Sequence, residues 1–353
     1  MKEMDTMKAL TVFGPGDARI TEVPAPHPHG DMVKIKVVRT GVCATDQAIY
    51  TGNCSFVRSG EIVYPVRMGH EYSGIVYEVG ENVKSFSPGD RVYTDNGVSC
   101  GKCRPCLEGR YGDCLAPRSV GTVNCWDGCY AEYMYMPERH VYRIPDSLGF
   151  EEAALIEPAS ISLDAFFGIS DGKGETAVII GTGAIGMACA WIAKYLGYGK
   201  VAVVGRSPKK LDVALRIGAD TVINSRECDV VESIKGMTDG RGAAHIIESS
   251  GDGTALVNAI RSAAKDGRVS MLGFYEKDLD GIPVDQIVLN RITMRGGAGR
   301  FGNPSKVAEI MSKNTVPLTP VITHRIKFED CLDIFKNEKA YHDSKIKAMV
   351  CFD

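Results

Sequence analysis

The sequence predicts an α/β protein with a β-rich first domain and a second domain built on a doubly wound parallel sheet. Within the first 150 residues, apolar and polar residues alternate in short runs such as residues 33–37, and turns such as residues 87–90 separate these runs. From about residue 176, short apolar segments alternate with amphipathic helices, which is typical of parallel strands joined by right-handed crossovers. A chain of 353 residues is also long enough for two domains.

The expected elements follow in chain order. The first pattern predicts antiparallel strands, including one at residues 73–79. The second pattern predicts parallel strands at residues 176–180, 201–204, 220–223, 244–248 and 268–272. Farther on, helices are expected at residues 307–311 and 331–337, and a last strand at 346–352. We therefore expect a first domain over residues 1–158, an inserted domain over 159–300, and a segment over 301–353 that returns to the first domain.

The composition favours a small-molecule ligand. The chain has 41 basic and 44 acidic residues, well mixed, and a formal net charge of −3, which argues against nucleic acid or an anionic membrane as a partner. The first residues are charged and polar, and no apolar run is long enough to span a membrane. Twelve cysteines without paired spacing outside one cluster suit a reducing compartment. We therefore expect a cytoplasmic protein.

That cluster has the spacing of a structural zinc site. Two, two and seven residues separate its four cysteines, Cys100, Cys103, Cys106 and Cys114. Short Cys-x-x-Cys steps present successive sulfurs to one point, and a tetrahedron of four thiolates leaves no open position for chemistry. A ferredoxin-like cluster or two disulfides are the alternatives. Zinc is favoured because iron-sulfur sites usually have a different fourth spacing, and nothing indicates export.

A glycine loop predicts a dinucleotide site. The motif Gly-x-Gly-x-x-Gly lies between the strand at residues 176–180 and a helix that reaches about residue 196, the context that makes this motif specific. Its glycines permit a tight turn, a close approach of the pyrophosphate and close packing of helix and strand. The helix start supplies partial positive charge to the phosphates. The expected cofactor contacts are Gly181, Thr182, Gly183, Ala184, Ile185 and Gly186.

The end of the second parallel strand favours NADP over NAD. Gly205 stands where a protein that binds NAD usually carries an acid for the ribose hydroxyls. Arg206, Ser207 and Lys210 could instead donate hydrogen bonds or supply charge to a 2′-phosphate. A solvated basic surface without a phosphate role is the alternative. We also expect cofactor contacts after the last predicted strand of this sheet, from Leu272, Gly273 and Phe274.

A second set of metal-ligating residues stands apart from the cysteine cluster. It comprises Cys43, the pair His70 and Glu71, and Glu157. Three mixed protein ligands with one exchangeable position are the composition of a catalytic zinc site. Each residue alone would be unremarkable, since a single cysteine or histidine is more often part of the core.

These motifs together resemble the zinc-dependent medium-chain dehydrogenase/reductase family. The resemblance rests on the run Gly-His-Glu-x-x-Gly at residues 69–74 with Gly80 and Val83 after it, the four-cysteine loop and the nucleotide loop, in this order, and it covers residues 7–353. The carboxylate pair and the segments 299–303 and 323–325 resemble the polyol branch of sorbitol or L-iditol dehydrogenases, to which threonine and glucose dehydrogenases are related. The family implies a GroES-like catalytic domain and a Rossmann cofactor domain.

The resemblance also implies roles for individual residues. Cys43 and His70 would bind the catalytic zinc, with Glu71 as the third ligand. Glu157 would hold the zinc-bound water or exchange with Glu71, and the sequence leaves this choice open. Asp46 matches the carboxylate that orients the histidine ligand.

Two further matches concern the proton and the substrate. Thr45 matches the hydroxyl that relays the leaving proton, and Arg300 matches an arginine near the substrate of polyol dehydrogenases. Two departures affect the pocket: Ala44 replaces the family's glycine, and Tyr50 is displaced by one position from the aromatic residue of sorbitol dehydrogenases.

The expected activity is hydride transfer between a secondary alcohol of a polyol or sugar and NADP, or NAD, which yields the ketone. A polar pocket of Thr45, Tyr50, Glu71, Glu157 and Arg300 would suit a polyhydroxylated substrate. A threonine-type or simple alcohol dehydrogenase is the first alternative. A non-catalytic zinc- and NADP-binding relative is remote, because it would be expected to lack Cys43 or His70. We expect a homo-oligomer, either a dimer or a tetramer.

Overall fold

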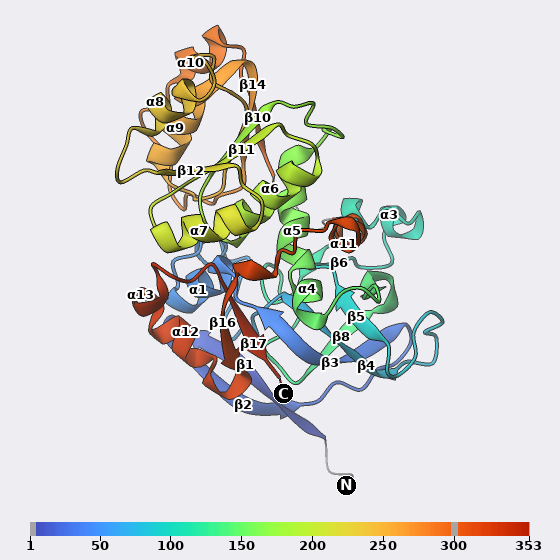
Figure 1. Ribbon diagram of the computed structural model, residues 1–353. Helices are drawn as coiled ribbons and strands as arrows, with labels where there is room; N and C mark the ends of the chain where they lie inside the picture. Colours follow the sequence, from blue (N-terminus) through green and yellow to red (C-terminus); the bar gives the residue numbers. More distant parts are fainter. Residues whose placement is uncertain (1–4, 298–302, 353) are drawn as a thin grey trace.

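The structure is a computed structural model that describes residues 5–297 and 303–352. Figure 1 shows a domain with a parallel sheet at the top and a β-rich domain at the bottom, with α5 (Ile156–Leu163) between them. The expected substrate-binding residue Arg300 lies outside the described residues.

The β-rich domain is built on one large sheet, as the alternating patterns predict. Its strand order is β16-β17-β3-β4-β5-β9, and β8 pairs with β3. The members are β3 (Met32–Gly41), β4 (Glu71–Val79), β5 (Arg91–Thr94), β8 (Tyr133–Pro137), β9 (Val141–Arg143), β16 (Ile322–Lys327) and β17 (Lys347–Cys351). Two small antiparallel pairs accompany it, β1 (Thr6–Gly14) with β2 (Asp17–Pro24), and β6 (Gly97–Val98) with β7 (Arg118–Ser119).

Short helices connect the strands of this domain. They are α1 (Ala44–Thr51), α2 (Ser55–Arg58), α3 (Arg104–Leu107), α4 (Phe150–Ala154) and the 3-10 turns η1 (Tyr111–Asp113), η2 (Glu138–His140) and η3 (Asp164–Phe166). Helix α1 begins directly after β3, so it holds its first residues at the end of a central strand.

The second domain contains a doubly wound parallel sheet, which confirms the predicted fold class. Its order is β12-β11-β10-β13-β14-β15, and every neighbouring pair is parallel. This is the order of dinucleotide-binding sheets. The strands are β10 (Thr176–Ile180), β11 (Lys200–Gly205), β12 (Thr221–Asn224), β13 (Ala243–Glu248), β14 (Ala263–Met271) and β15 (Thr293–Gly296).

Helices cover both faces of this sheet. Along β10, Ala177 and Ile179 pack into one core, and Val178 and Ile180 pack into the core on the opposite face. A strand buried on both faces reads as a continuous apolar run, which is why the sequence pattern located it. The helices are α6 (Ala184–Tyr195), α7 (Pro208–Arg216), α8 (Val230–Gly236), α9 (Gly253–Ser262) and α10 (Val284–Leu289).

The C-terminal segment packs on both domains. Helix α11 (Pro304–Lys313) shares a core with α5 and α6, where the indole of Trp191 donates a hydrogen bond to the Val316 carbonyl at 2.7 Å. The chain then enters the lower sheet through η4 (Thr319–Val321), β16, η5 (Phe328–Asp330), α12 (Leu332–Lys336), α13 (Glu338–Tyr341) and β17 (Figure 1). The division of the chain at residues 158 and 300 stays a prediction.

Candidate active site

Three potential metal ligands meet at the ends of β3 and β4. One ligand atom each from Cys43, His70 and Glu71 lies within 4.8 Å of the other two. Cys43 directly precedes α1, His70 directly precedes β4, and Glu71 is the first residue of that strand. Because β3 and β4 are antiparallel neighbours, the end of one strand lies beside the start of the other, and residues far apart in sequence converge.

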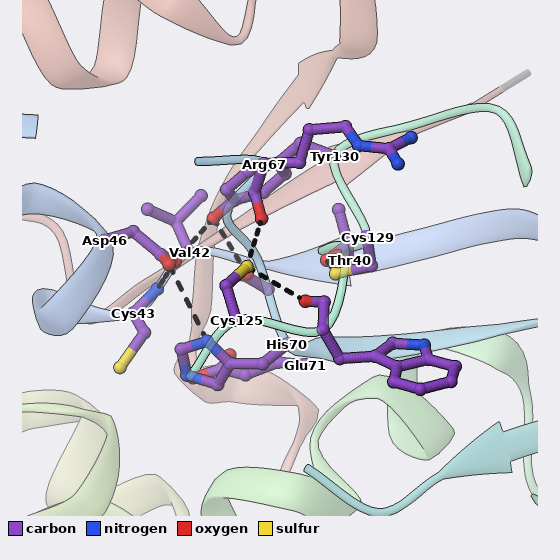
Figure 2. A network of polar contacts seen from close by, with 12 residues as sticks. Thr40, Val42, Cys43, Asp46, Arg67, His70, Glu71, Cys125, Cys129 and Tyr130 are labelled. Atoms are coloured by element: carbon purple, nitrogen blue, oxygen red, sulfur yellow. Dashed lines mark hydrogen bonds and ion pairs between the residues drawn. The ribbon is translucent and has the colours of Figure 1, made fainter. Parts of the chain in front are cut away.

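The surroundings of His70 fit a metal centre. Its Nδ1 lies 3.7 Å from Oδ1 of Asp46, and neither atom has a hydrogen-bond partner among the described residues (Figure 2). The other ring nitrogen remains available to a metal. A histidine that binds zinc usually donates a hydrogen bond from its second nitrogen to a carboxylate, and here Asp46 faces that nitrogen at a slightly longer distance. Burial opposes protonation of His70, but Asp46 and Cys43 outweigh it and hold its pKa well above the ordinary value. This surplus of negative charge suits a cation.

Lys347 neutralises Glu71. The Lys347 Nζ lies 2.6 and 2.5 Å from the two Glu71 carboxylate oxygens and also donates to the Val42 carbonyl at 3.1 Å. Burial favours the neutral amine, but the charges of Glu71 and Cys43 outweigh it and raise the pKa of Lys347. Gly41 is required beside this pair, because a Cβ there would lie 2.0 Å from a Glu71 oxygen.

The sequence analysis missed Lys347. The signal was a lysine inside an otherwise apolar strand, since such a strand buries a lysine only when the lysine has an anionic partner. The partner itself, 276 residues away, is visible only in the fold.

Glu157 lies near this group but is not part of the three-atom cluster. It stands in the first turn of α5 and is 7% exposed. Burial raises the pKa of Glu157 to about 7, with a further increase from Glu71 and an opposing effect of His70. A carboxyl group with this pKa exchanges protons readily near neutral pH. The choice between Glu71 and Glu157 as third ligand stays open.

The other expected residues of the site that the structure describes lie on α1. Thr45 is half-buried in the first turn of α1, and Asp46 is fully buried beside His70. The Tyr50 ring packs against Phe335, with ring centroids 5.9 Å apart, and its role in the pocket stays a prediction. Tyr50 and its neighbour Ile49 both belong to the same buried cluster of apolar side chains.

The four cysteines of the other predicted site converge as well. One sulfur from each of Cys100, Cys103, Cys106 and Cys114 lies within 4.8 Å of the rest, and none forms a disulfide in the described part of the chain. Backbone N–H groups point at the sulfurs, as from Cys100 to Cys114 at 3.2 Å. Hydrogen bonds from the amides of Lys102 and Cys103 lower the pKa of Cys100 to about 6, which favours the thiolate that a metal binds. Four converging sulfurs fit a structural zinc ion.

The glycine loop has the geometry that a pyrophosphate requires. Gly181 has φ +122°, and a Cβ on Gly186 would lie 2.2 Å from the Gly181 carbonyl, so helix α6 packs tightly on the loop. In contrast, a Cβ on Gly183 would meet nothing within 4 Å. The space in front of Gly183 is therefore open to a ligand. The remaining loop residues, Thr182, Ala184 and Ile185, are half-buried around the start of α6.

The end of β11 lies against the C-terminal segment. Arg206 is exposed and Lys210 is half-buried, as a phosphate site would require, but the Ser207 hydroxyl donates to the Asp343 carbonyl at 2.7 Å. Its proton is therefore not available to a phosphate. A second half-buried lysine, Lys345, comes from the same segment. Burial lowers the pKa of Lys210, and the nearby Lys345 and Arg206 charges lower it further.

Gly205 has a packing role that the sequence did not reveal. A Cβ at this position would lie 2.3 Å from Cγ2 of Thr182 in the glycine loop. The absence of an acid therefore also reflects the close contact between β11 and that loop.

The segment after β14 meets the β-rich domain. Leu272 is buried, and a Cβ on Gly273 would lie 2.2 Å from the Gly251 amide, so the backbone is tightly enclosed. The half-exposed Phe274 ring contacts Phe56 of α2 edge-on, with centroids 5.6 Å apart. Two residues farther on, Glu276 accepts a hydrogen bond from Arg58 at 2.9 Å. This segment thus connects the two domains at the position predicted for cofactor contacts.

Comparison with known proteins identifies the family. Residues 29–146 match the alcohol dehydrogenase GroES-like domain, and residues 184–314 match the zinc-binding dehydrogenase domain. The chain is 33% identical to a sorbitol dehydrogenase of Bacillus subtilis over 347 residues, which is 98% of this chain and 97% of that protein. It is also 33% identical to an L-threonine 3-dehydrogenase of Pyrococcus abyssi over 352 residues, 99% of each chain.

A solved structure supports the same assignment. A putative zinc-binding dehydrogenase of Sinorhizobium meliloti, bound to NADP, superposes with a TM-score of 0.86 at 28% identity and covers 99% of this chain and 100% of that chain. Among the described helices, none is both long and apolar enough to cross a membrane. Three findings agree: the GroES-like and Rossmann domains, the two cysteine-containing clusters, and the relatives named above. The chain is therefore an enzyme that acts on CH–OH donors. It belongs to the zinc-type medium-chain dehydrogenase/reductase family, which includes polyol dehydrogenases.

Proposed function

We propose that this enzyme oxidises a secondary alcohol of a polyol or sugar to the ketone, with NADP preferred over NAD. The observation that carries the proposal is the group of Cys43, His70 and Glu71 at the ends of two central strands, with the buried carboxyl of Glu157 close by. A mixed sulfur, nitrogen and oxygen donor set is typical of a catalytic zinc site.

Each residue of the site has a proposed task. When bound, zinc would make the alcohol more acidic, and the nicotinamide would accept the hydride. Cys43, His70 and one of the two carboxylates would hold the metal, and Thr45 would pass the leaving proton toward solvent. Glu157, with a pKa of about 7, would accept or return a proton near neutral pH.

Polyols are the proposed substrates because the site is rich in hydrogen-bonding groups. Glu157 and Thr45 can each accept a hydrogen bond from a substrate hydroxyl. A simple aliphatic alcohol has only the reacting hydroxyl, so it would leave these acceptors without a partner. Several relatives that match 92% or more of the chain are L-threonine 3-dehydrogenases, so oxidation of an amino alcohol is the second candidate. A primary amine in the substrate would then need one of the carboxylates as its partner.

The preference for NADP is proposed from the charges around β11. Arg206, Lys210 and Lys345 are three neighbouring cations beside the end of β11, where the adenosine ribose of the cofactor would lie. The structural relative from Sinorhizobium meliloti was solved with NADP. Charge-assisted hydrogen bonds of this kind contribute about 1.5–3 kcal/mol each, less where solvent screens them.

We also propose one catalytic and one structural zinc ion per chain, a homo-oligomeric assembly, either a dimer or a homotetramer, and a cytoplasmic location. The structural ion would occupy the cysteine loop around α3, where four sulfurs converge.

Substrate profiling tests the proposal. Steady-state kcat/KM should be measured for a panel of sugar alcohols, inositols, sugars, L-threonine and 2-butanol, each with NADP and NAD. We expect a polyol with NADP to give a value at least tenfold above L-threonine and 2-butanol. A higher value for L-threonine would select the amino-alcohol reaction, and a tenfold preference for NAD would overturn the proposed cofactor.

A further inference from the structure

Tyr130 is a buried tyrosine whose hydroxyl points at the active site. It is fully buried, and its hydroxyl donates to Oδ2 of Asp46 at 2.7 Å. The Gly41 carbonyl lies farther from the same hydroxyl, at 3.2 Å. A hydroxyl has a single proton, and the shorter bond to a carboxylate is the stronger of the two. No motif in the sequence assigns a function to this residue.

The surrounding residues hold the ring of Tyr130 in place. The Leu10 amide donates to its carbonyl at 2.8 Å, and the Phe335 ring contacts the Tyr130 ring edge-on at 5.9 Å. Gly69, directly before His70, has φ +96°, and a Cβ on it would lie 3.0 Å from the Tyr130 ring. The ring therefore occupies the space that a side chain at residue 69 would fill.

This contact determines how Asp46 is oriented. Oδ2 of Asp46 accepts two hydrogen bonds, from the Tyr130 hydroxyl and from the Cys43 amide at 2.9 Å. With Oδ2 held from both sides, the carboxylate cannot rotate freely, and Oδ1 remains directed at Nδ1 of His70 at 3.7 Å (Figure 2). The chain of contacts runs from Tyr130 through Asp46 to both Cys43 and His70.

We infer that Tyr130 is a positioning residue of the metal centre, which acts through Asp46 to fix the orientation of the His70 imidazole and of Cys43. The inference rests on the proposed metal-binding role of Cys43 and His70. Groups that orient metal ligands typically contribute 10- to 100-fold to metal affinity. A tyrosine that only stabilised the core would not change metal affinity.

The test removes only the hydroxyl. Tyr130→Phe keeps the ring and its contacts, and Tyr198→Phe is the matched control, because Tyr198 is also buried and its hydroxyl makes one hydrogen bond, to Nδ1 of His245 at 2.9 Å, in the other domain. Zinc affinity is measured on the full-length protein by chelator competition. The visible spectrum of the Co²⁺-substituted protein reports the geometry of the ligands.

Of the two proposed zinc ions, the one at Cys43 and His70 would be the more labile, because its site would keep an exchangeable position. Tyr130→Phe should raise the dissociation constant of this labile zinc about 10- to 100-fold and shift the Co²⁺ bands, while Tyr198→Phe changes neither. In an Asp46→Asn background, Tyr130→Phe should have a much smaller additional effect, because the two residues act as one unit. This double-mutant comparison measures the effect of Tyr130→Phe on zinc affinity with and without the Asp46 carboxylate. It therefore separates an effect that passes through Asp46 from a general loss of stability.

Two results would contradict different parts of the argument. If wild-type protein bound no labile zinc, the proposed metal centre itself would be wrong. If wild-type protein bound it and Tyr130→Phe retained wild-type zinc affinity and Co²⁺ bands, the metal centre would stand, and Tyr130 would be a core residue only.

Discussion

The Nζ of Lys347 lies within 2.6 Å of both carboxylate oxygens of Glu71, and both side chains are at most 3% exposed. A buried ion pair adds little net stability, but the loss of one partner leaves an uncompensated charge in the interior. The pair also places the positive charge of β17 beside a potential zinc ligand.

Lys347→Met should therefore destabilise the protein by about 3–5 kcal/mol, because it leaves Glu71 buried without its partner. Urea unfolding followed by fluorescence measures this loss. Lys34→Met is the matched control, since Lys34 is also buried but lies 3.9 Å from the half-exposed Glu78. A Glu71→Gln/Lys347→Met double variant should recover part of the stability, and equal losses in Lys34→Met and Lys347→Met would argue against the pair as the cause.

The two cysteine-containing sites should lose metal at different rates. In the proposed assignment the site of Cys43 and His70 would keep an exchangeable position, whereas the four-cysteine loop would offer none, so mild chelation should leave about one zinc per chain and little activity. Metal analysis after graded EDTA treatment checks this. Cys103→Ser should reverse the order by weakening the loop site. Simultaneous release of both metals from the wild type would contradict the assignment.

Substitution of the second and of the third glycine of the nucleotide loop should affect the protein in different ways. Gly183→Ala adds a methyl group into open space, so the melting temperature should stay nearly unchanged while the dissociation constant for the cofactor rises, because the methyl group obstructs the pyrophosphate. Gly186→Ala places a Cβ 2.2 Å from the Gly181 carbonyl and should lower the melting temperature itself. Thermal unfolding and calorimetric binding separate the two effects, and similar melting temperatures in both variants would refute the packing argument.

The proposed NADP preference should depend on residues from two distant segments of the chain. Arg206→Ala and Lys345→Ala should each lower kcat/KM for NADP about tenfold with little change for NAD, as loss of one charge-assisted contact implies. Lys209→Ala is the matched control, because Lys209 is an exposed lysine next to this cluster. Gly205→Asp is unsuitable as a cofactor switch, since its Cβ would displace Thr182. An unchanged NADP to NAD ratio in both variants would assign these residues to the solvated surface.

Stability should fall on mild acidification because His245 is buried in its neutral form. Burial, with a contribution from Arg268, lowers the pKa of His245 from 6.5 to about 4. Between these two values the unfolded chain binds a proton that the folded chain does not, so stability is complete above pH 6.5 and decreases as the pH falls toward 4.

The slope for this histidine should reach about 1.4 kcal/mol per pH unit. His245→Gln should make the measured dependence of the unfolding free energy on pH shallower in this window, whereas His342→Gln, at an exposed site, should leave it unchanged. A variant of His245 with the wild-type slope would show that other groups control acid unfolding.

Periodicity predicted the buried strands well and the partly exposed ones poorly. Strand β10 was placed at its observed bounds because apolar residues fill both of its faces. Strands β15 and β16 were not anticipated, because their residues are mostly half-buried or exposed and show no continuous apolar run. The candidate metal ligands were predicted for a different reason, because each lies in a short segment with a recognisable motif. The fold then brings these segments together.

The supporting residues of the site could not be read from the sequence. Lys347 and Tyr130 reach Glu71 and Asp46 across 276 and 84 residues, and a single lysine or tyrosine carries no spacing signal. The pocket role of Tyr50 stays a prediction, and its ring lies in the same buried cluster as Ile49. The tertiary structure decides which side chains form hydrogen bonds or ion pairs with the residues of the site, and these contacts cannot be derived from the sequence pattern.

The position of β17 also affects how the enzyme is made. Glu71 is synthesised 276 residues before Lys347, which at roughly 5–20 residues per second corresponds to about 14–55 seconds on the ribosome. During that interval the strands of the inserted parallel sheet, which lie within residues 176–296, can pair with one another, whereas the β-rich sheet lacks β17, one of its inner strands. A nascent chain released before β17 would have no cation for Glu71, so incomplete products should stay open and accessible to proteases.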